Sequence, residues 1–166
     1  MNIILIGYRG TGKSSIGKTL AEKLNRHLIS MDEVIVKKGK QSIPDMVAEH
    51  GWGYFRNLES EVAAEVAKKD NCIIDCGGGV ILRDENVKNL KTKGKFFLLK
   101  ADIDTIISRI QGDVNRPSLK KGMTFREEQE KVLKERAPKY QTAADVEIDT
   151  SILSINQAVE KILKHI

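Results

Sequence analysis

Apolar and polar positions alternate along the chain in two different ways. Short runs made almost entirely of apolar residues, such as residues 3–6, are separated by longer stretches in which apolar residues return at helical spacing, as Ile16, Leu20 and Leu24 do. A short, fully apolar run is typical of a strand buried on both faces, and a spacing of about four residues places side chains on one helix face. The pattern therefore predicts strands that alternate with helices.

Five of the apolar runs are predicted to be strands, at residues 3–6, 27–29, 72–74, 96–99 and 146–148. Helical patterns follow the first strand, run through Lys69 after the second, and cover residues 85–92, 102–110 and the C-terminal stretch to His165. This order is typical of βαβ units, in which the strands are parallel and helices cover both faces of the sheet. At 166 residues the chain has the length of one domain, so we expect a single α/β domain over residues 1–166.

One irregular segment interrupts this order. Residues 112–122 begin and end with glycine and include Asn115, Arg116 and Lys120. Glycine at both ends permits a hinge, so we expect a mobile lid at about residues 112–124. A plain surface loop is the alternative, although the length of the segment is unusual for one.

The composition is that of an ordinary soluble protein, with 40% hydrophobic and 31% charged residues. A formal net charge of +5 suits anionic ligands, because a positive field in a cleft attracts anions; a lysine-rich solvated surface is the alternative source of that charge. Nucleic acid is a poor candidate partner, since the basic residues form no single tract and aromatic residues make up only 5% of the chain.

The chain also lacks signals for export or membrane insertion. The apolar run at residues 2–6 is interrupted by Gly7, and it has neither a basic leader nor a small-residue cleavage site. This pattern favours a strand over a signal peptide. No apolar run approaches the roughly 20 residues needed to cross a bilayer. Cys72 and Cys76 share one short segment, where a disulfide would be strained and a metal would lack further ligands. We therefore expect a cytoplasmic protein without a membrane partner.

A phosphate-binding motif lies between the first strand and the first helix. Residues 7–14 read Gly-Tyr-Arg-Gly-Thr-Gly-Lys-Ser, the Walker A pattern, in the structural context that its mechanism requires. The glycines permit a loop of inward-facing N–H groups, Lys13 is expected to reach the β and γ phosphates, and the Ser14 hydroxyl is expected to ligate Mg²⁺. A glycine turn with an incidental lysine fits these flanks poorly. The predicted ATP-binding residues of the loop are Gly10, Thr11, Gly12, Lys13, Ser14 and Ser15.

Polar residues at two further places have functional and structural interpretations. Asp32 follows the second strand, where it can orient or deprotonate an acceptor hydroxyl, or cap a helix that begins at Glu33. Arg56 and Glu59 share one helix face, and an intrahelical ion pair is the simpler reading of this pair taken alone.

Three consecutive glycines follow the third strand. Residues 75–79 read Asp-Cys-Gly-Gly-Gly, and such a run weakens local structure unless something must approach the backbone closely. A polyhydroxylated ligand bonded to exposed N–H groups is such a reason. The carboxyl ends of parallel strands meet at one edge of a sheet, so these glycines are expected to lie near Asp32 and the phosphate loop.

Taken together, these motifs resemble the shikimate kinase family over essentially the whole chain, including Arg116-Pro117 and residues 135–140 (Glu-Arg-Ala-Pro-Lys-Tyr). The resemblance implies a three-layer P-loop kinase fold with strand order 2-3-1-4-5, and catalytic roles for Lys13, Asp32 and Arg116. It also implies that Arg116 lies over the phosphates and Arg109 against the adenine. The shikimate ligands that it implies are Asp32, Arg56, Gly77, Gly78, Gly79 and Arg136, with Glu59 supporting Arg56.

The chain departs from the family pattern at four positions, namely Ser30, Trp52, Asp75 and Ser118. An aspartate usual after the second strand is replaced by Ser30, whereas Asp75 has the place of a carboxylate that holds Mg²⁺ in many P-loop enzymes. We expect Ser14 and Asp75 to organise the metal and Asp32 to serve mainly the acceptor. In the alternative, Asp75 caps the glycine turn, and Ser14 and Asp32 hold the metal.

The expected reaction is transfer of phosphate from ATP to the 3-hydroxyl of shikimate, with Mg²⁺, by a monomeric enzyme. Another small-metabolite kinase, such as a gluconate kinase, is the nearest rival. The pair Arg56 and Arg136 argues against it, because two guanidinium groups suit a ring carboxylate. A non-catalytic ATP-binding module is the rival of another class, and it requires neither Asp32 nor a basic lid.

Overall fold

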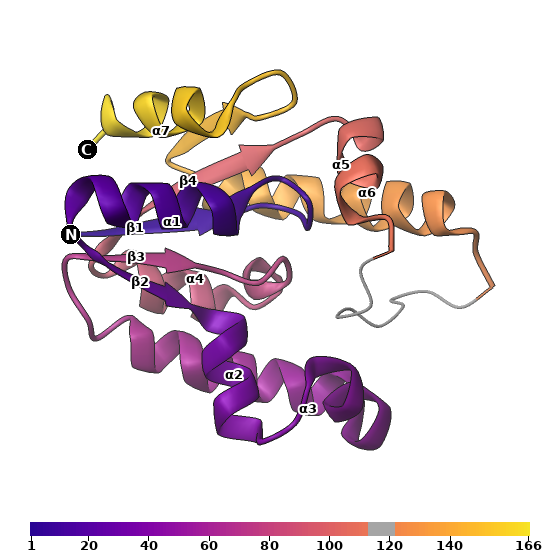
Figure 1. Ribbon diagram of the computed structural model, residues 1–166. Coiled ribbons are helices and arrows are strands. Elements are labelled where there is room, and N and C mark those ends of the chain that lie inside the picture. Colours follow the sequence, from indigo (N-terminus) through magenta and orange to yellow (C-terminus); the bar gives the residue numbers. More distant parts are fainter. Residues whose placement is uncertain (113–121) are drawn as a thin grey trace.

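The computed structural model describes residues 1–112 and 122–166, and its centre is a five-stranded sheet (Figure 1). The strands are β1 (Asn2–Ile6), β2 (His27–Ser30), β3 (Cys72–Asp75), β4 (Gly94–Lys100) and β5 (Val146–Asp149). All pairings are parallel, and the strand order is β2-β3-β1-β4-β5. The predicted α/β fold, the five strands and the order 2-3-1-4-5 are confirmed.

Helices connect successive strands and cover both faces of the sheet (Figure 1). Their bounds are α1 (Lys13–Leu24), α2 (Met31–Gly39), α3 (Ile43–Val66), α4 (Asp84–Lys91), α5 (Ile103–Ile110), α6 (Phe125–Ala143) and α7 (Ile155–Leu163), with a short 3-10 helix η1 (Val80–Leu82). Within the described residues, no helix combines the length and the apolar character needed to span a membrane.

The alternation of side chains along β1 divides the interior into two cores. Ile3 and Leu5 face α1 and α7, in a cluster with Ile16, Phe97 and Val159. The neighbouring residues Ile4 and Ile6 point to the opposite face, in a larger cluster that draws on α2, α3, α4 and α6. Because successive side chains of a strand point to opposite faces, a strand that is apolar at every position is buried on both sides. This arrangement is the three-layer architecture that the resemblance implies.

Helix α6 is absent from the elements that the hydrophobic pattern predicts. The helix is only weakly amphipathic, since it buries few residues. It also contains Pro138, which has no backbone N–H to donate within the helix. The helix nevertheless has a clear start, because the Thr124 side chain accepts from the Glu127 N–H while the Glu127 carboxylate accepts from the Thr124 N–H. This capping box is a sequence signal for a helix beginning at residue 125.

The carboxyl ends of the strands point to the end of the molecule where α5 and α6 lie, and both chain termini lie at the opposite end (Figure 1). The loops that follow β1, β2, β3 and β5 therefore meet at one edge of the sheet. In open α/β sheets this edge is where ligands bind. Most of the predicted lid at about residues 112–124 cannot be placed on this frame, because residues 113–121, including Arg116 and Ser118, lie outside the described part of the chain.

Candidate active site

The loop between β1 and α1 is closely packed against its neighbours. Gly7 has φ 144°, and a Cβ at this position would lie 2.3 Å from the carbonyl oxygen of Leu99, so no side chain fits there. The Lys13 ammonium donates to the carbonyl oxygens of Gly7 and Tyr8 at 2.9 and 3.0 Å. These bonds hold the Lys13 side chain along the inside of the loop. Its ammonium group thereby adds a positive charge to the anion-binding concavity that the backbone N–H groups form.

Two hydroxyl groups hold this loop in place, one by a bond within the loop and one by a bond to α6. Thr11 Oγ1 donates to the Tyr8 carbonyl at 2.8 Å, which closes the loop on itself. The buried Tyr8 hydroxyl donates to Oε1 of Gln129 on α6 at 2.7 Å. Burial raises the pKa of Tyr8, so this hydroxyl remains a donor at neutral pH. The loop is therefore held in its shape before any ligand arrives.

Ser14 and Asp75 meet at the start of α1 and the end of β3. The Ser14 hydroxyl donates to Oδ2 of Asp75 at 2.6 Å, and Asp75 is only 8% exposed. A hydroxyl and a carboxylate are hard oxygen donors of the kind that Mg²⁺ prefers. The two residues that we expect to organise the metal thus lie side by side.

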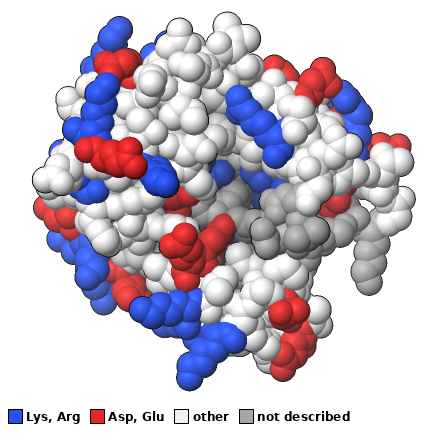
Figure 2. Space-filling model, viewed as in Figure 1, with Lys and Arg blue, Asp and Glu red and all other residues white. Residues whose placement is uncertain are grey.

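A cavity of about 630 Å³ opens in front of these residues. Figure 2 shows that this face of the molecule is hollowed near its centre, with basic side chains inside the hollow. The cavity brings together the predicted phosphate-loop residues, Asp32, Asp75 and Arg109 with an apolar end formed by Ile110, Leu153, Ile155 and Ala158. A polar end of phosphate-binding groups and an apolar end suit a nucleotide, whose phosphates and base differ in the same way.

Arg109 lies between the phosphate loop and the loop after β5. Its Nη1 donates to the Gly10 carbonyl at 3.0 Å, and its Nη2 donates to the Thr150 carbonyl at 3.0 Å. The buried Thr150 hydroxyl in turn donates to the Thr11 carbonyl at 2.9 Å. These bonds fix Arg109 beside the apolar end of the cavity, which is compatible with the predicted adenine contact.

Asp32 lies in the first turn of α2, and it is not the helix cap. The cap is Ser30, whose Oγ accepts from the Glu33 N–H, so the alternative interpretation of Asp32 as a cap is wrong. The departure at Ser30 thereby has a structural role, since serine is among the preferred capping residues. A Cβ at Gly77 would lie 2.9 Å from Oδ1 of Asp32, so the glycine loop passes directly against this carboxylate.

The third glycine of the run lies against Arg56. A Cβ at Gly79 would be 2.1 Å from Nη1 of Arg56, so any side chain at this position would displace the guanidinium group. The same Nη1 donates to Oε2 of Glu59 at 2.7 Å, and the Glu59 side chain is only 2% exposed. The intrahelical ion pair is therefore present, and it holds Arg56 against the glycine run, an arrangement compatible with the predicted role of Arg56 toward the acceptor.

The second glycine contacts α6. Arg136 Nη1 donates to the Gly78 carbonyl at 3.2 Å, and the Tyr140 hydroxyl donates to the same oxygen. Burial raises the pKa of Tyr140 well above its ordinary value, against the opposing effect of the Arg136 charge, so the hydroxyl keeps its proton. Each of the three glycines thus contacts a different predicted shikimate ligand.

The predicted site residues form two adjoining groups in the described part of the chain. The nucleotide and metal residues line the cavity, whereas Arg56, Arg136 and the glycines gather beside it, and Asp32 contributes to both groups. This adjacency is what transfer between two bound substrates requires. Arg116 lies outside the described residues, so the prediction for it stays a prediction.

Sequence reasoning assigned no role to Tyr140 or Thr150, although both fix parts of the site. Each has a signal in the sequence. Tyr140 is four residues after Arg136 and therefore shares its helix face, and Thr150 directly follows the fifth strand at its carboxyl end.

Comparison with known proteins agrees with this geometry. A family model described as Shikimate kinase matches residues 9–166. The shikimate kinase of Thermodesulfovibrio yellowstonii is 41% identical over 98% of this chain and 93% of its own length. That of Syntrophus aciditrophicus is 40% identical over 98% of this chain and 89% of its own length.

Solved structures show the same relationship. The shikimate kinase from Acinetobacter baumannii in complex with shikimate has a TM-score of 0.93 and 30% identity, covering 99% of this chain and 91% of that one. A gluconokinase from Sinorhizobium meliloti has a TM-score of 0.57 and 14% identity, covering 98% of this chain and 89% of that one, which shows a shared fold alone. Because the family model and the relatives span nearly the whole chain, the chain belongs to the shikimate kinase family.

Proposed function

We propose that this chain transfers the γ-phosphate of ATP to the 3-hydroxyl group of shikimate, giving shikimate 3-phosphate and ADP. One observation carries the proposal: Gly77, Gly78 and Gly79 contact Asp32, Arg136 and Arg56 respectively, beside the phosphate-loop cavity. The acceptor site therefore has two guanidinium groups, a carboxylate and a glycine backbone. Shikimate is a ring carboxylate with three hydroxyls, and it offers a partner for each of these groups.

The two arginines recognise the carboxylate of the acceptor, and Asp32 recognises its reacting hydroxyl. Arg56 and Arg136 approach from α3 and α6, and a carboxylate between two guanidinium groups accepts charge-assisted bonds from both. Asp32 is the group that orients the acceptor hydroxyl or takes its proton as the phosphoryl group arrives. Its place in the cavity lining, next to the phosphate loop, supports this role.

Phosphoryl transfer depends mainly on positioning and charge. The Lys13 ammonium group is already held in the loop, and it stabilises the negative charge on the β and γ phosphates. We propose Arg116 as the second cation, on a lid of about residues 112–124; this role rests on the sequence alone. Arg109 is proposed for the adenine face, supported by its position at the apolar end of the cavity.

The donor set also fits Mg²⁺, which we propose as the metal of the reaction. Ser14 and Asp75 are the residues that would hold it, through an adjacent hydroxyl and carboxylate, with Asp32 lining the same cavity. When bound, Mg²⁺ neutralises the charge that develops on the phosphate oxygens. The protein contributes the Ser14 to Asp75 hydrogen bond, which orients both oxygens.

A coupled ADP-release assay tests the proposal with shikimate, gluconate and a nucleoside monophosphate offered in parallel. Turnover with shikimate alone is the expected result, and turnover with gluconate and none with shikimate would refute it. ATP binding without turnover of any acceptor would favour a non-catalytic module. We also propose a monomer of one domain, which sedimentation equilibrium checks as a single species of about 18.6 kDa.

A further inference from the structure

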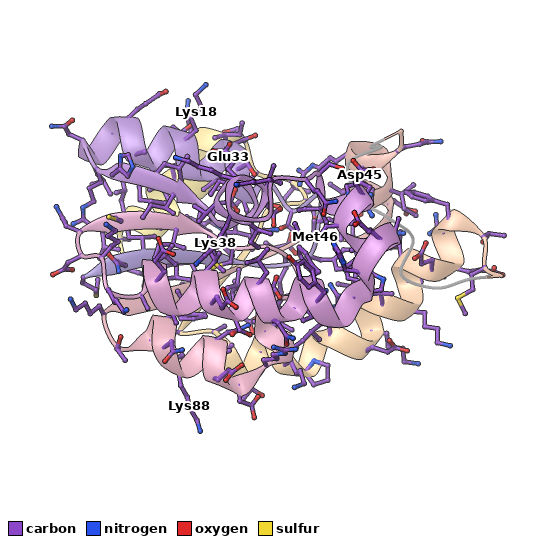
Figure 3. All side chains as sticks on the ribbon, turned by 90° about the horizontal axis from the view of Figure 1, so that it is seen from below. Lys18, Glu33, Lys38, Asp45, Met46 and Lys88 are labelled. Carbon is purple, nitrogen blue, oxygen red and sulfur yellow. The ribbon has the colours of Figure 1, made fainter. Side chains whose placement is uncertain are left out.

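Trp52 is the single tryptophan of the chain and lies at a break in α3. Gly51 has φ 83° and ψ 170°, which interrupts the helical path, and a new helical segment begins immediately after it. Asp45 and Met46 mark the part of α3 before this break (Figure 3). Residues four apart share a helix face, so the restart places Trp52 one turn before Arg56 and on the same side.

Arg56 lies against two aromatic rings. Its guanidinium carbon is 5.3 Å from the centroid of the Trp52 ring and 5.0 Å from that of Phe55. The two rings meet edge to face, with centroids 5.6 Å apart and an interplanar angle of 86°. A guanidinium group within about 6 Å of an aromatic centroid is attracted by the negative face of the ring. The two rings therefore form a corner that receives the guanidinium group.

The remaining contacts fix the guanidinium group from other directions. Glu59 accepts from Nη1 at 2.7 Å, and the guanidinium group occupies the space that a Cβ at Gly79 would need, so it lies directly against the Gly79 backbone. The Arg56 side chain is only 14% exposed as a result. Arginine has several freely rotating bonds, so holding its head in one place costs conformational entropy that these contacts offset.

We infer that Trp52 is a positioning residue for shikimate binding, which acts by holding Arg56 in the orientation that receives the substrate carboxylate. The inference rests on the proposed function and adds to it a residue that departs from the family pattern. Phe55 is 1% exposed in the main core, so its ring also supports the fold. Trp52 is only partly buried at the edge of that core, and its replacement is compatible with folding.

The test compares Trp52→Leu, which removes the aromatic face, with Trp52→Phe, which keeps a ring of weaker attraction. We expect Trp52→Leu to raise the KM for shikimate about 2- to 30-fold, with kcat and the KM for ATP changed less than about 2-fold. Trp52→Phe is expected to lie between Trp52→Leu and the wild type. Tyr54→Leu is the matched control, because Tyr54 lies on the same segment, is 44% exposed and has its ring in contact with that of His50 instead.

A double-mutant cycle separates this role from a direct contact or a structural effect. In an Arg56→Met background, Trp52→Leu is expected to leave kcat/KM for shikimate unchanged, because the group that it positions is gone. An unchanged KM for shikimate in Trp52→Leu would overturn the inference, and so would the same fold-loss in both backgrounds. If Trp52→Leu does not fold, the cycle is run with Trp52→Phe. Wild-type turnover of shikimate is measured first, and its absence would count against the proposed function instead.

Discussion

The hydroxyl oxygen of Ser14 lies 2.6 Å from the carboxylate oxygen Oδ2 of Asp75. This bond joins the first turn of α1 to the last residue of β3. It couples the Walker A loop to the glycine run that follows Asp75, although the two are more than sixty residues apart along the chain. Asp75 is one of the positions at which the chain differs from the family pattern, and its contact with Ser14 leads to a prediction about magnesium binding.

Asp75→Asn is expected to raise the Mg²⁺ concentration needed for half-maximal activity. The amide keeps the size of the side chain but loses the charge that attracts a hard cation. The measurement is a Mg²⁺ titration of the initial rate at saturating substrates, with Asp84→Asn as a control, because the Asp84 side chain is 87% exposed on α4. An unchanged Mg²⁺ profile with a lower melting temperature would favour turn capping by Asp75 and return the metal to Ser14 and Asp32.

Arg136→Ala is expected to weaken shikimate use and to leave ATP affinity nearly unchanged. Removal of one guanidinium from a charge-assisted pair costs about 2–4 kcal/mol in kcat/KM for shikimate. Lys134→Ala, an exposed change on the same helix, is the control. Loss of ATP binding in an equilibrium titration, with shikimate binding intact, would reassign Arg136 to the nucleotide.

Lys13 and Arg116 are expected to fail at different stages of the reaction. Lys13 is held by two carbonyl oxygens of the preformed loop, so Lys13→Ala should reduce both ATP binding and turnover. Arg116→Ala should chiefly lower kcat, by roughly 100-fold or more for a lost charge-stabilising contact. Steady-state kinetics and ATP titration of both variants check this difference, and a normal kcat in Arg116→Ala would remove that residue from the mechanism.

Stability is expected to fall as the pH rises above about 10, and Tyr140 is one cause. Burial raises the pKa of this phenol in the folded state above the ordinary value of 10.0, so the unfolded chain releases the proton first. Between the two pKa values the folded state binds more protons, and each such tyrosine lowers the free energy of unfolding by about 1.4 kcal/mol per pH unit. Below pH 10 its contribution is constant.

Urea unfolding of the wild type and Tyr140→Phe between pH 8 and about 11 measures this effect. Tyr140→Phe should lose about 1 kcal/mol at pH 8 through the missing hydrogen bond to Gly78, and its stability should decline less steeply at higher pH. Equal slopes for the two proteins would show that Tyr140 does not titrate between its folded and unfolded values as argued.

The sequence predicts those parts of this molecule that depend on local pattern. The five strands are confirmed because each contains a short apolar run, buried on both faces in the central strands β1 and β3 and only partly buried in the edge strands β2 and β5. The predicted position of the glycine-containing loop, between the first strand and the first helix, also agrees with the structure. The strand order came from the family resemblance, since periodicity carries no information on which strands are neighbours. The contacts of Asp32, Arg56 and Arg136 with the glycine run agree with the predicted grouping.

The hydrophobic pattern does not predict a helix with a weak apolar face, the exact residue that caps a helix, or a contact between residues far apart in the sequence. Helix α6 escaped prediction because Pro138 and a weakly apolar face obscure its helical signal. The cap of α2 is Ser30 and not Asp32, a choice of a single residue that backbone geometry decides. The bond from Tyr8 to Gln129 joins residues 121 positions apart, and no local feature of either residue indicates the other.

Helix α6 touches both halves of the site. Gln129 accepts from Tyr8 of the phosphate loop, and two to three turns further along the helix Arg136 and Tyr140 donate to the carbonyl oxygen of Gly78 in the glycine run. A small rotation of this one helix would alter both loops together. With ATP and shikimate bound as proposed, such a rotation would link the occupancy of the two sites thermodynamically. Such linkage is reciprocal: the factor by which ATP tightens shikimate binding would equal the factor by which shikimate tightens ATP binding.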